Sequence, residues 1–472
     1  MNTALSIGWA KKEITPPFET PLAGFVRRIE MNTNIVADPL FVRCLIIRSA
    51  QMQAVLLVYD LLGFNESVGN ALRETVIQET GFSSAQIIIA CTHTHSAPPT
   101  IELTKCGKIN PVYVELLKEK SIKVVRQALR RNQPVSCIFN RFHLPDLSVN
   151  RRDASQVTND NISVLQFKKG RSTLGVVVHF SAHPNAVCED RISADYPGYV
   201  CRQLEQKLGI PFAMFLLGTA GDTNLLVNEF SYTEMERFGS KIFEAVKSAL
   251  DRGEQVEVRN LDVVERELSL ELTPHTKTGR VEKKIRAINE FILEFIKSRG
   301  KHPHKGALYR KISWILLKKD LVGVDPDTVH FVALALLENN QRYLSALSKT
   351  NRSSVKLRIQ FLLLDGLIFI FAGAELFAHI FLELEKKFPG KKVLLCGYLD
   401  PLLGYIAPEE EYKRGGYEVD EAFLFYGAGL PFAKSTEQTL VAYLSDQLSE
   451  LYARETRHKE SAIRPSSPGK AI

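Results

Sequence analysis

The chain has few cysteines for its size, and none of them forms a Cys-x-x-Cys pair. The seven cysteines are odd in number and widely spaced along 472 residues. A small secreted domain held by disulfides has an even set at closer spacing, so this pattern predicts reduced thiols. The N-terminus also lacks a basic segment followed by a long apolar core, which is the pattern of a signal peptide. We therefore expect a cytoplasmic protein.

Long apolar runs and concentrated basic charge are also missing. The most apolar window, residues 361–371, is interrupted by Asp365 and Gly366 and is too short to cross a bilayer as a helix. The net charge is only +7, and Lys and Arg are scattered without interleaved aromatic residues, so no nucleic-acid partner is expected. A glycine-containing turn at 218–224 is not followed by Gly-Lys-Ser/Thr, which leaves nucleotide binding with little support.

Two histidines one residue apart follow a run of β-branched residues. The run at 87–90 is followed by His93 and His95 and then by two prolines, which predicts a buried strand that stops at a loop. Alternate side chains of a strand share a face, so we expect both imidazoles to project together at the C-terminal edge of a sheet, where open α/β sheets bind ligands. Two imidazoles there could hold zinc, or pair one ligand with one acid/base group. The alternative is a pair of loop histidines that bond only to backbone carbonyls.

A second strand-like run, at 173–180, also ends at a histidine. His183 follows it after two small residues and precedes a proline. This repeats the arrangement at His93, and we expect the two histidines to lie at the edge of the same sheet.

A carboxylate occupies a comparable position near the C-terminus. Residues 355–364 and 367–371 flank an Asp-Gly pair, which predicts a β-hairpin with a type I′ turn. The second strand leads into Glu375, and a helix is expected over 376–387. Glu375 would cap that helix by default, and the alternative is that it faces a cleft at the sheet edge.

The order of elements predicts the fold class. Strands alternate with helices along most of the chain, without an internal repeat or a clear linker, which indicates a large layered α/β domain with mixed sheets over residues 1–455. A helical, Lys-rich insertion is expected at about 274–350, a final helix over 435–455 and a disordered tail at 456–472. Within the insertion, 307–319 is basic and amphipathic. It is typical of a solvated helix face, and the alternative is a lid or an element that touches a membrane surface.

Taken together, the short motifs of this chain resemble those of the neutral ceramidase family, the zinc-dependent amidases that split ceramide into sphingosine and a fatty acid. The resemblance covers roughly residues 8–450 and follows the order of the family. The matching motifs are Thr92-His93-Thr94-His95-Ser96, Asn150-Arg151, Ser181-Ala182-His183-Pro184, 193–198, Gly373-Ala374-Glu375, and Gly404-Tyr405 followed by Glu410, Tyr412 and Tyr417. The family's signal peptide and C-terminal immunoglobulin-like domain are not expected in this chain.

The resemblance implies a set of site residues around one zinc ion. The ligands that it implies are His93, His183, Glu375 and Tyr405. These groups leave room for a water on the metal, and bound zinc lowers the pKa of water towards ~7. The resemblance further implies that His95 moves a proton to the leaving amine, and that Arg151 and Tyr417 hold the scissile carbonyl.

One motif departs from the family. Members that act on ceramide have a Gly-Asp-x-Ser-Pro-Asn turn, whereas Gly221-Asp222-Thr223-Asn224 lacks the serine and the proline. A serine nucleophile is therefore not supported, and Thr223 is a weak substitute. We expect hydrolysis of an N-acyl amide, a ceramide-like lipid that is split into a sphingoid base and a fatty acid, with the insertion shaping or covering an acyl pocket. The alternatives are a zinc hydrolase of a non-lipid amide or ester, and a non-catalytic binding protein of the same fold.

Overall fold

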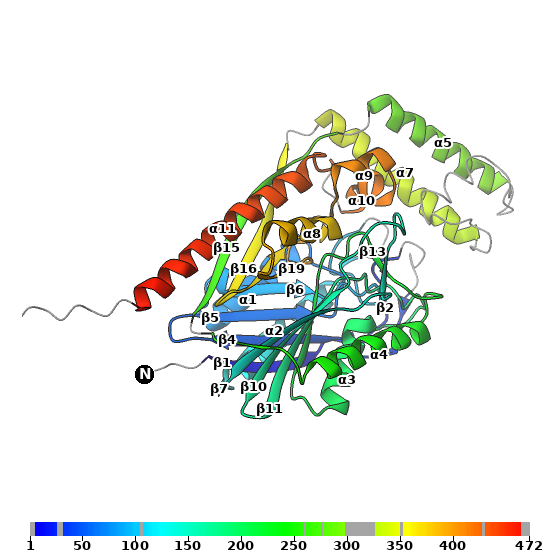
Figure 1. Cartoon of the computed structure of the whole chain (residues 1–472). Helices are drawn as coiled ribbons and strands as arrows, with labels where there is room; N and C mark the ends of the chain where they lie inside the picture. The colour runs from blue at the N-terminus through cyan, green and yellow to red at the C-terminus, as the bar shows by residue number, and fades with distance from the viewer. Residues whose placement is uncertain are drawn as a thin grey trace, which may run out of the picture.

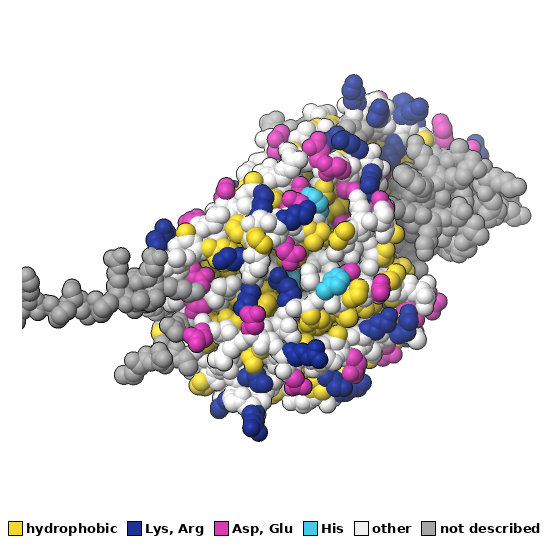
Figure 2. Space-filling model, in the orientation of Figure 1, with side chains coloured by type: hydrophobic (Ala, Val, Ile, Leu, Met, Phe, Trp, Pro, Cys, Tyr) yellow, Lys and Arg dark blue, Asp and Glu magenta, His cyan; other side chains and the backbone are white. Residues whose placement is uncertain are grey.

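The computed structural model describes residues 5–25, 32–103, 107–258, 260–274, 277–297, 326–349, 353–426 and 430–463 (Figure 1). The basic amphipathic stretch 307–319 lies outside these residues. No helix in the described part of the chain combines the length and the apolar character that crossing a membrane requires. On the face drawn in Figure 2, acidic and basic side chains are interspersed.

The first sheet is built from the N-terminal third of the chain and has the strand order β6-β5-β4-β1-β7. Its strands are β1 (Ser6–Glu13), β4 (Phe41–Arg48), β5 (Gln53–Tyr59), β6 (Ile87–Cys91) and β7 (Gln133–Pro134). Helices α1 (Glu66–Thr80) and α2 (Pro111–Leu129) bury their apolar residues against one face of it. A single 3₁₀ turn, Ser84–Gln86, leads into β6. Two very short strands, β2 (Thr20–Pro21) and β3 (Asn32–Thr33), pair separately.

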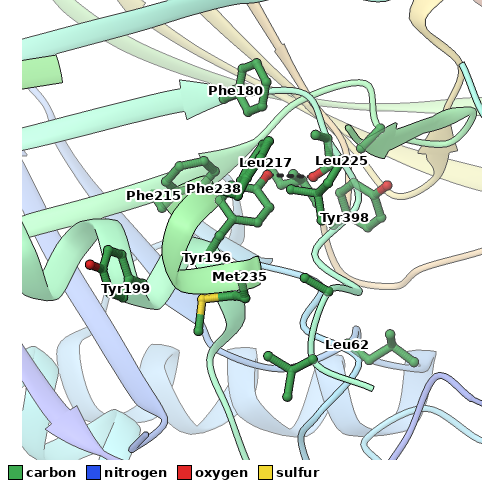
Figure 3. Close-up of a cluster of buried hydrophobic side chains, with 14 of the residues drawn as sticks. Leu62, Phe180, Tyr196, Tyr199, Phe215, Leu217, Leu225, Met235, Phe238 and Tyr398 are labelled. Carbon is green, nitrogen blue, oxygen red and sulfur yellow. Dashed lines mark hydrogen bonds between the residues drawn. The ribbon is translucent and has the colours of Figure 1, made fainter. Parts of the chain in front are cut away.

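The second sheet has the order β12-β11-β10-β8-β14. Its strands are β8 (Ser136–His143), β10 (Asn161–Lys169), β11 (Ser172–Phe180), β12 (Ala213–Leu217) and β14 (Glu254–Val256). Helices α3 (Asp195–Lys207) and α4 (Tyr232–Ala249) cover its outer face. Figure 3 shows this core, in which the Tyr196 hydroxyl donates a 2.5 Å hydrogen bond to the Ala182 carbonyl and so anchors the segment before His183.

The third sheet has the order β15-β16-β17-β19. Its strands are β15 (Leu261–Glu271), β16 (Ser354–Leu364), β17 (Leu367–Ala372) and β19 (Lys392–Cys396), and α8 (Ala378–Lys387) and α11 (Thr436–Ile463) pack on it. The predicted hairpin is confirmed: Leu364 lies opposite Leu367, and φ is positive at both Asp365 (36°) and Gly366 (86°).

The insertion leaves and re-enters the third sheet between two strands that pair with each other. Glu271 at the end of β15 lies opposite Ser354 at the start of β16. The described part of the insertion consists of α5 (Thr278–Lys297) and α7 (Pro326–Lys349), which extend beyond the sheets in Figure 1. Because its two ends are neighbours, the insertion adds length without breaking the sheet.

The three sheets enclose a common core. Its fully buried members include Ile7 from the first sheet, Phe167 from the second and Phe371 from the third. Mixed sheets packed in layers with helices outside them confirm the predicted α/β fold class.

Each of the three sheets also contains one parallel pair of strands, and the ends of these pairs meet. The pairs are β5 with β6, β11 with β12, and β17 with β19. The Cys91 amide donates to the Tyr398 carbonyl (3.1 Å), and the Gly397 amide donates to the Leu217 carbonyl (3.2 Å). The carboxyl ends of strands from all three sheets are thereby joined at one place.

Two sequence-based expectations were wrong here. His93 and His183 do not lie at the edge of one sheet, because β6 belongs to the first sheet and β11 to the second. A buried run identifies a strand, but its partners are set by contacts distant in sequence.

The last helix does not stop near 455: α11 continues to Ile463, since no proline interrupts it before Pro465. Residues 464–472 lie outside the described part.

Candidate active site

Three histidines bring their Nε2 atoms together where the three sheets meet. The Nε2 atom of His183 lies 3.2 Å from that of His93 and 2.9 Å from that of His95. The ligand atoms of all three lie within 4.8 Å of one another. His93 and His183 are buried, whereas His95 is partly exposed, so the group can be reached from the His95 side.

Backbone carbonyls hold the opposite nitrogen of each ring. The Nδ1 atoms of His93, His95 and His183 bond to the carbonyls of Leu62 (2.6 Å), Gly24 (3.1 Å) and Ala220 (3.2 Å) respectively. A carbonyl only accepts hydrogen bonds, so each Nδ1 carries the proton and each neutral ring presents a lone pair at Nε2. Three lone pairs that face one another are satisfied by a cation, and this is the tautomer that metal-binding histidines adopt.

Electrostatics favour the neutral form of the innermost histidine. Burial, followed by the positive charge of Arg151 and the neighbouring imidazoles, lowers the pKa of His183 well below its usual range. A neutral imidazole is the form that binds a metal ion.

The backbone after β6 departs from the predicted extended conformation. The strand ends at Cys91, and His93 has a left-handed φ of 63°. The His93 amide donates to the Leu61 carbonyl (2.9 Å), and the Tyr398 ring lies against the imidazole with centroids 4.3 Å apart. The histidines therefore meet because the chain turns here, and the segment just after β5 holds this turn. The prediction that strand alternation would bring the two rings together was wrong.

Glu375, which comes shortly after β17 of the third sheet, lies against the histidine group. It begins the short strand β18 (Glu375–Leu376), and its Oε2 lies 3.2 Å from His93 Nε2 and 3.9 Å from His183 Nε2. Among the described residues this buried Oε2 has no hydrogen-bond partner. A buried carboxylate oxygen that faces imidazole lone pairs is well suited to share a metal ion with them.

The default expectation that Glu375 caps the following helix was wrong. Helix α8 begins at Ala378, whose amide donates to Asp222 Oδ1 (2.9 Å). Asp222 comes from the turn after β12, so it satisfies the free amide of α8 and leaves the Glu375 side chain to face the histidines.

Tyr405 lies beside Glu375 on the short strand β20 (Tyr405–Ile406), which pairs in parallel with β18. Burial and the Glu375 charge raise the pKa of Tyr405 well above its usual range. The Arg151 guanidinium lies over the Tyr405 ring at 5.3 Å. The predicted residues Tyr405 and Arg151 therefore flank the carboxylate side of the histidine group.

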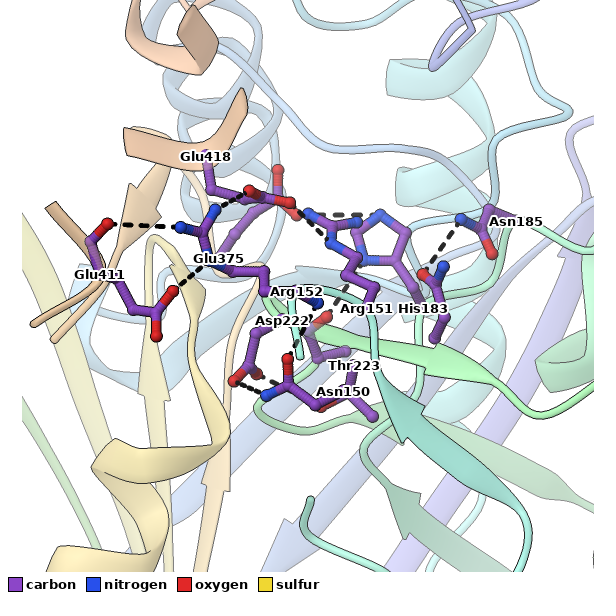
Figure 4. Close-up of polar contacts among 12 residues, drawn as sticks. Asn150, Arg151, Arg152, His183, Asn185, Asp222, Thr223, Glu375, Glu411 and Glu418 are labelled. Atoms are coloured by element: carbon purple, nitrogen blue, oxygen red, sulfur yellow. Dashed lines mark hydrogen bonds and ion pairs between the residues drawn. The ribbon is translucent and has the colours of Figure 1, made fainter. Parts of the chain in front are cut away.

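Ion pairs hold the segment that carries Tyr417 (Figure 4). Tyr417 begins a short π-helix, Tyr417–Glu421, after α9 (Glu409–Arg414), and its ring lies 6.0 Å from that of Tyr405. Glu418 pairs with Arg151 (Nε to Oε1, 2.9 Å) and with Arg152. Arg152 also pairs with Glu411, so buried charges connect both arginines to the tyrosine segment.

Thr223 is buried in the strand β13 (Thr223–Leu225), which pairs with β9 (Ser148–Asn150). Its hydroxyl donates to Asp222 Oδ1 at 3.2 Å, and Asp222 also accepts a 2.8 Å hydrogen bond from Asn150 Nδ2. The Thr223 hydroxyl thus belongs to the network around Asp222, which gives no support to a nucleophile at this position.

Three residues near the site were not identified from the sequence. Tyr426 follows α10 (Ala422–Phe425) and donates to Glu375 Oε1, Tyr398 packs on His93, and Arg152 connects Glu411 with Glu418. No motif marks the two tyrosines. The only signal for Arg152 was its position next to Arg151.

A cavity of about 1360 Å³ shares the Tyr426 side chain with this site. Helix α7 of the insertion contributes to its wall, together with the segments around Ile101 and Leu402. Its lining includes several charged residues: Glu66, Glu102, Lys108, Glu338, Arg342 and Lys356.

Comparison with known proteins identifies the fold. No family model and no curated protein matches the sequence. In structure, the chain is similar to the neutral ceramidase from Pseudomonas aeruginosa, with a TM-score of 0.71 and 17% identity over 96% of this chain and 75% of that one. It is also similar to a ceramidase complexed with C2, with a TM-score of 0.68 and 16% identity over 96% and 76% of the two chains. The chain therefore has the fold of the neutral ceramidases.

Proposed function

We propose that this protein is a zinc-dependent hydrolase that cleaves an N-acyl amide of the ceramide type. The observation that carries the proposal is the convergence of three Nε2 lone pairs with the unpartnered Oε2 of Glu375. This group lies where the carboxyl ends of strands from three sheets meet, within a fold shared with ceramidases. The resemblance of the motifs to that family, drawn from the sequence, supports the same activity.

The residues present fit a zinc ion. In the proposal His93, His183 and Glu375 hold the ion and Tyr405 supplies the fourth ligand, since imidazole and carboxylate are among the usual ligands of zinc. Bound zinc would lower the pKa of water towards ~7 and so make a nucleophile available at neutral pH.

The remaining roles follow from position and charge. His95 is the partly exposed histidine of the group, so it can exchange a proton with both the site and the solvent, and we assign it proton transfer to the leaving amine. Arg151 has a buried Nη2 without a hydrogen-bond partner in the described residues, and it would donate to the oxyanion that develops on the carbonyl. Tyr417, beside Tyr405, would orient the same carbonyl.

Metal analysis and hydrolysis assays test this proposal. The purified protein is expected to contain one zinc per chain, to lose N-acyl amide hydrolysis after chelation and to regain it when zinc is added. If the zinc-loaded protein hydrolyses no N-acyl substrate in a panel that includes ceramides, the proposed function is wrong.

The charged lining of the adjoining cavity supports a second candidate, hydrolysis of a polar amide or ester. A cavity for an acyl chain would be lined mainly by apolar side chains, whereas this one includes six charged residues. Short-chain and long-chain N-acyl amides that share one amine separate the two candidates. A higher kcat/KM for long chains supports the ceramide type, and a preference for short polar substrates supports the second.

A further inference from the structure

We infer that Tyr426 is a positioning residue that fixes the Glu375 carboxylate in the orientation that binds the metal ion. The inference rests on the metal centre of the proposed function, but it concerns a residue that none of the motifs contains. It does not depend on which amide is the substrate.

The two oxygens of Glu375 have different surroundings. Oε1 accepts a hydrogen bond from the Tyr426 hydroxyl. Oε2 is buried without a hydrogen-bond partner among the described residues and lies 3.2 Å from His93 Nε2. With Oε1 held by the phenol, rotation of the carboxylate is restricted and Oε2 stays directed at the histidines.

The ring of Tyr426 is itself held in place. Its amide donates to the Ala422 carbonyl at 3.2 Å, which ties it to the end of α10. The ring also lies close to the backbone of Gly404, since a Cβ atom built on that glycine would be only 3.4 Å from it. The Gly404 carbonyl in turn accepts a hydrogen bond from the Glu375 amide (2.9 Å). Gly404 thus contacts both the Tyr426 ring and the backbone of Glu375.

The insertion supports the same segment from outside. The rings of Tyr343 on α7 and Phe423 on α10 lie 5.1 Å apart in an edge-to-face contact. Lys284 on α5 pairs with Glu421, immediately before α10. Packing from both described helices of the insertion therefore stabilises the position from which Tyr426 reaches Glu375.

Tyr426→Phe removes the hydroxyl and keeps the ring. We expect the zinc Kd, measured by competition with a chromogenic chelator, to rise about 10- to 100-fold, which is the usual effect of losing a group that orients a metal ligand. Tyr452→Phe is the matched control, because the Tyr452 hydroxyl on α11 has no hydrogen-bond partner in the described residues. An unchanged zinc Kd in folded Tyr426→Phe would overturn the inference.

A double-mutant cycle tests whether the effect passes through the carboxylate. In a Glu375→Ala background, Tyr426→Phe should change the zinc Kd less than about twofold, because the hydroxyl no longer has a ligand to orient. Additive effects would contradict the inference.

A second pair of variants applies if Tyr426→Phe does not fold. Tyr426→Gln retains a hydrogen-bond donor, whereas Tyr426→Leu does not. The Gln variant should therefore bind zinc at least about fivefold more tightly than the Leu variant. Equal zinc affinities of the two variants would overturn the inference. All of these measurements use zinc without substrate. A protein that binds zinc through Tyr426-oriented Glu375 but hydrolyses no amide would refute the proposed function and leave this inference standing.

Discussion

The two halves of the candidate site are built differently. The histidine side consists of His93, His95 and His183, which follow the buried strands β6 and β11, and backbone carbonyls fix every ring. The tyrosine side, Glu375 with the segment 405–426, rests on two-residue strands, a short π-helix and buried ion pairs. Under the proposed function, we expect the histidine side to contribute most to metal affinity, and the tyrosine side to complete the ligand set and orient the carbonyl.

The largest effect is expected on the histidine side. His183→Ala removes the imidazole at the centre of the group, so the zinc content should fall from one per chain to near zero. Loss of the metal's contribution, several kcal/mol, should lower kcat/KM by at least about 10³-fold. His143→Ala, which alters an exposed histidine on β8, is the control and should retain both zinc and activity. Full zinc content in His183→Ala would contradict the assignment.

A His95 variant tests whether all three histidines are needed to bind zinc. If His95 moves a proton and is not an essential ligand, His95→Ala should retain zinc and lower kcat by about 10²- to 10⁴-fold. Zinc analysis alongside kcat separates the alternatives. Loss of zinc equal to that in His183→Ala would make His95 a third histidine ligand, which its 2.9 Å approach to His183 also permits.

Removing Arg152 should weaken the tyrosine side. Its side chain is only 2% exposed and pairs with both Glu411 and Glu418. Arg152→Met removes this buried cation, which leaves Glu418 with Arg151 and Glu411 with the exposed Arg414. We expect a loss of about 3–5 kcal/mol in the free energy of unfolding, measured by denaturant titration. Arg414→Met is the control: that arginine is 47% exposed and also pairs with Glu411, and its loss should cost less than about 1 kcal/mol. Equal losses of unfolding free energy in the two variants would show that the burial of Arg152 does not make its ion pairs stronger than those of Arg414.

A buried histidine outside the metal group gives a pH test of the core. Burial lowers the pKa of His179 to about 4, despite its hydrogen bond to the Leu395 carbonyl. Between pH 6.5 and 4 the unfolded chain takes up a proton that the folded chain does not, so stability falls as the pH falls through this window. At about 1.36 kcal/mol per pKa unit the loss approaches about 3 kcal/mol. His179→Gln should show a shallower decline in acid-dependent unfolding, and parallel curves would refute the assignment.

The smallest effect is expected at Thr223. Thr223→Val keeps the shape of the side chain and removes the hydrogen bond to Asp222, so kcat/KM should fall less than about tenfold. A fall beyond about 10³-fold, with zinc retained, would restore a nucleophilic role for this hydroxyl.

The histidine side and the fold class could be predicted from the sequence because their signals are local. Buried runs before His93 and His183, and the Asp-Gly turn before Glu375, each identify a strand and its end. Which strands pair is not a local property. The prediction therefore placed both histidines on one sheet, whereas His93 follows a strand of the first sheet, His183 follows a strand of the second, and Glu375 comes after β17 of the third.

Much of the tyrosine side could not be predicted from residue patterns. Tyr405 and Tyr417 were identified only through a resemblance to a family, and Tyr426 was missed. Its role depends on a contact with Glu375, 51 residues away in sequence, and a lone tyrosine after a short helix has no distinguishing pattern. The Asp222 cap was missed for the same reason. Asp222 follows a strand of the second sheet, whereas the helix that it caps, α8, packs on the third sheet.

The central claim of the proposal is that segments following strands of three different sheets bring together ligands for one zinc ion. Anomalous scattering at the zinc edge from crystals grown with zinc tests it most directly. The account predicts a single strong peak within ~2.0–2.2 Å of His93 Nε2, His183 Nε2 and a carboxylate oxygen of Glu375. No peak at this position, in crystals of a protein that hydrolyses N-acyl amides, would contradict it.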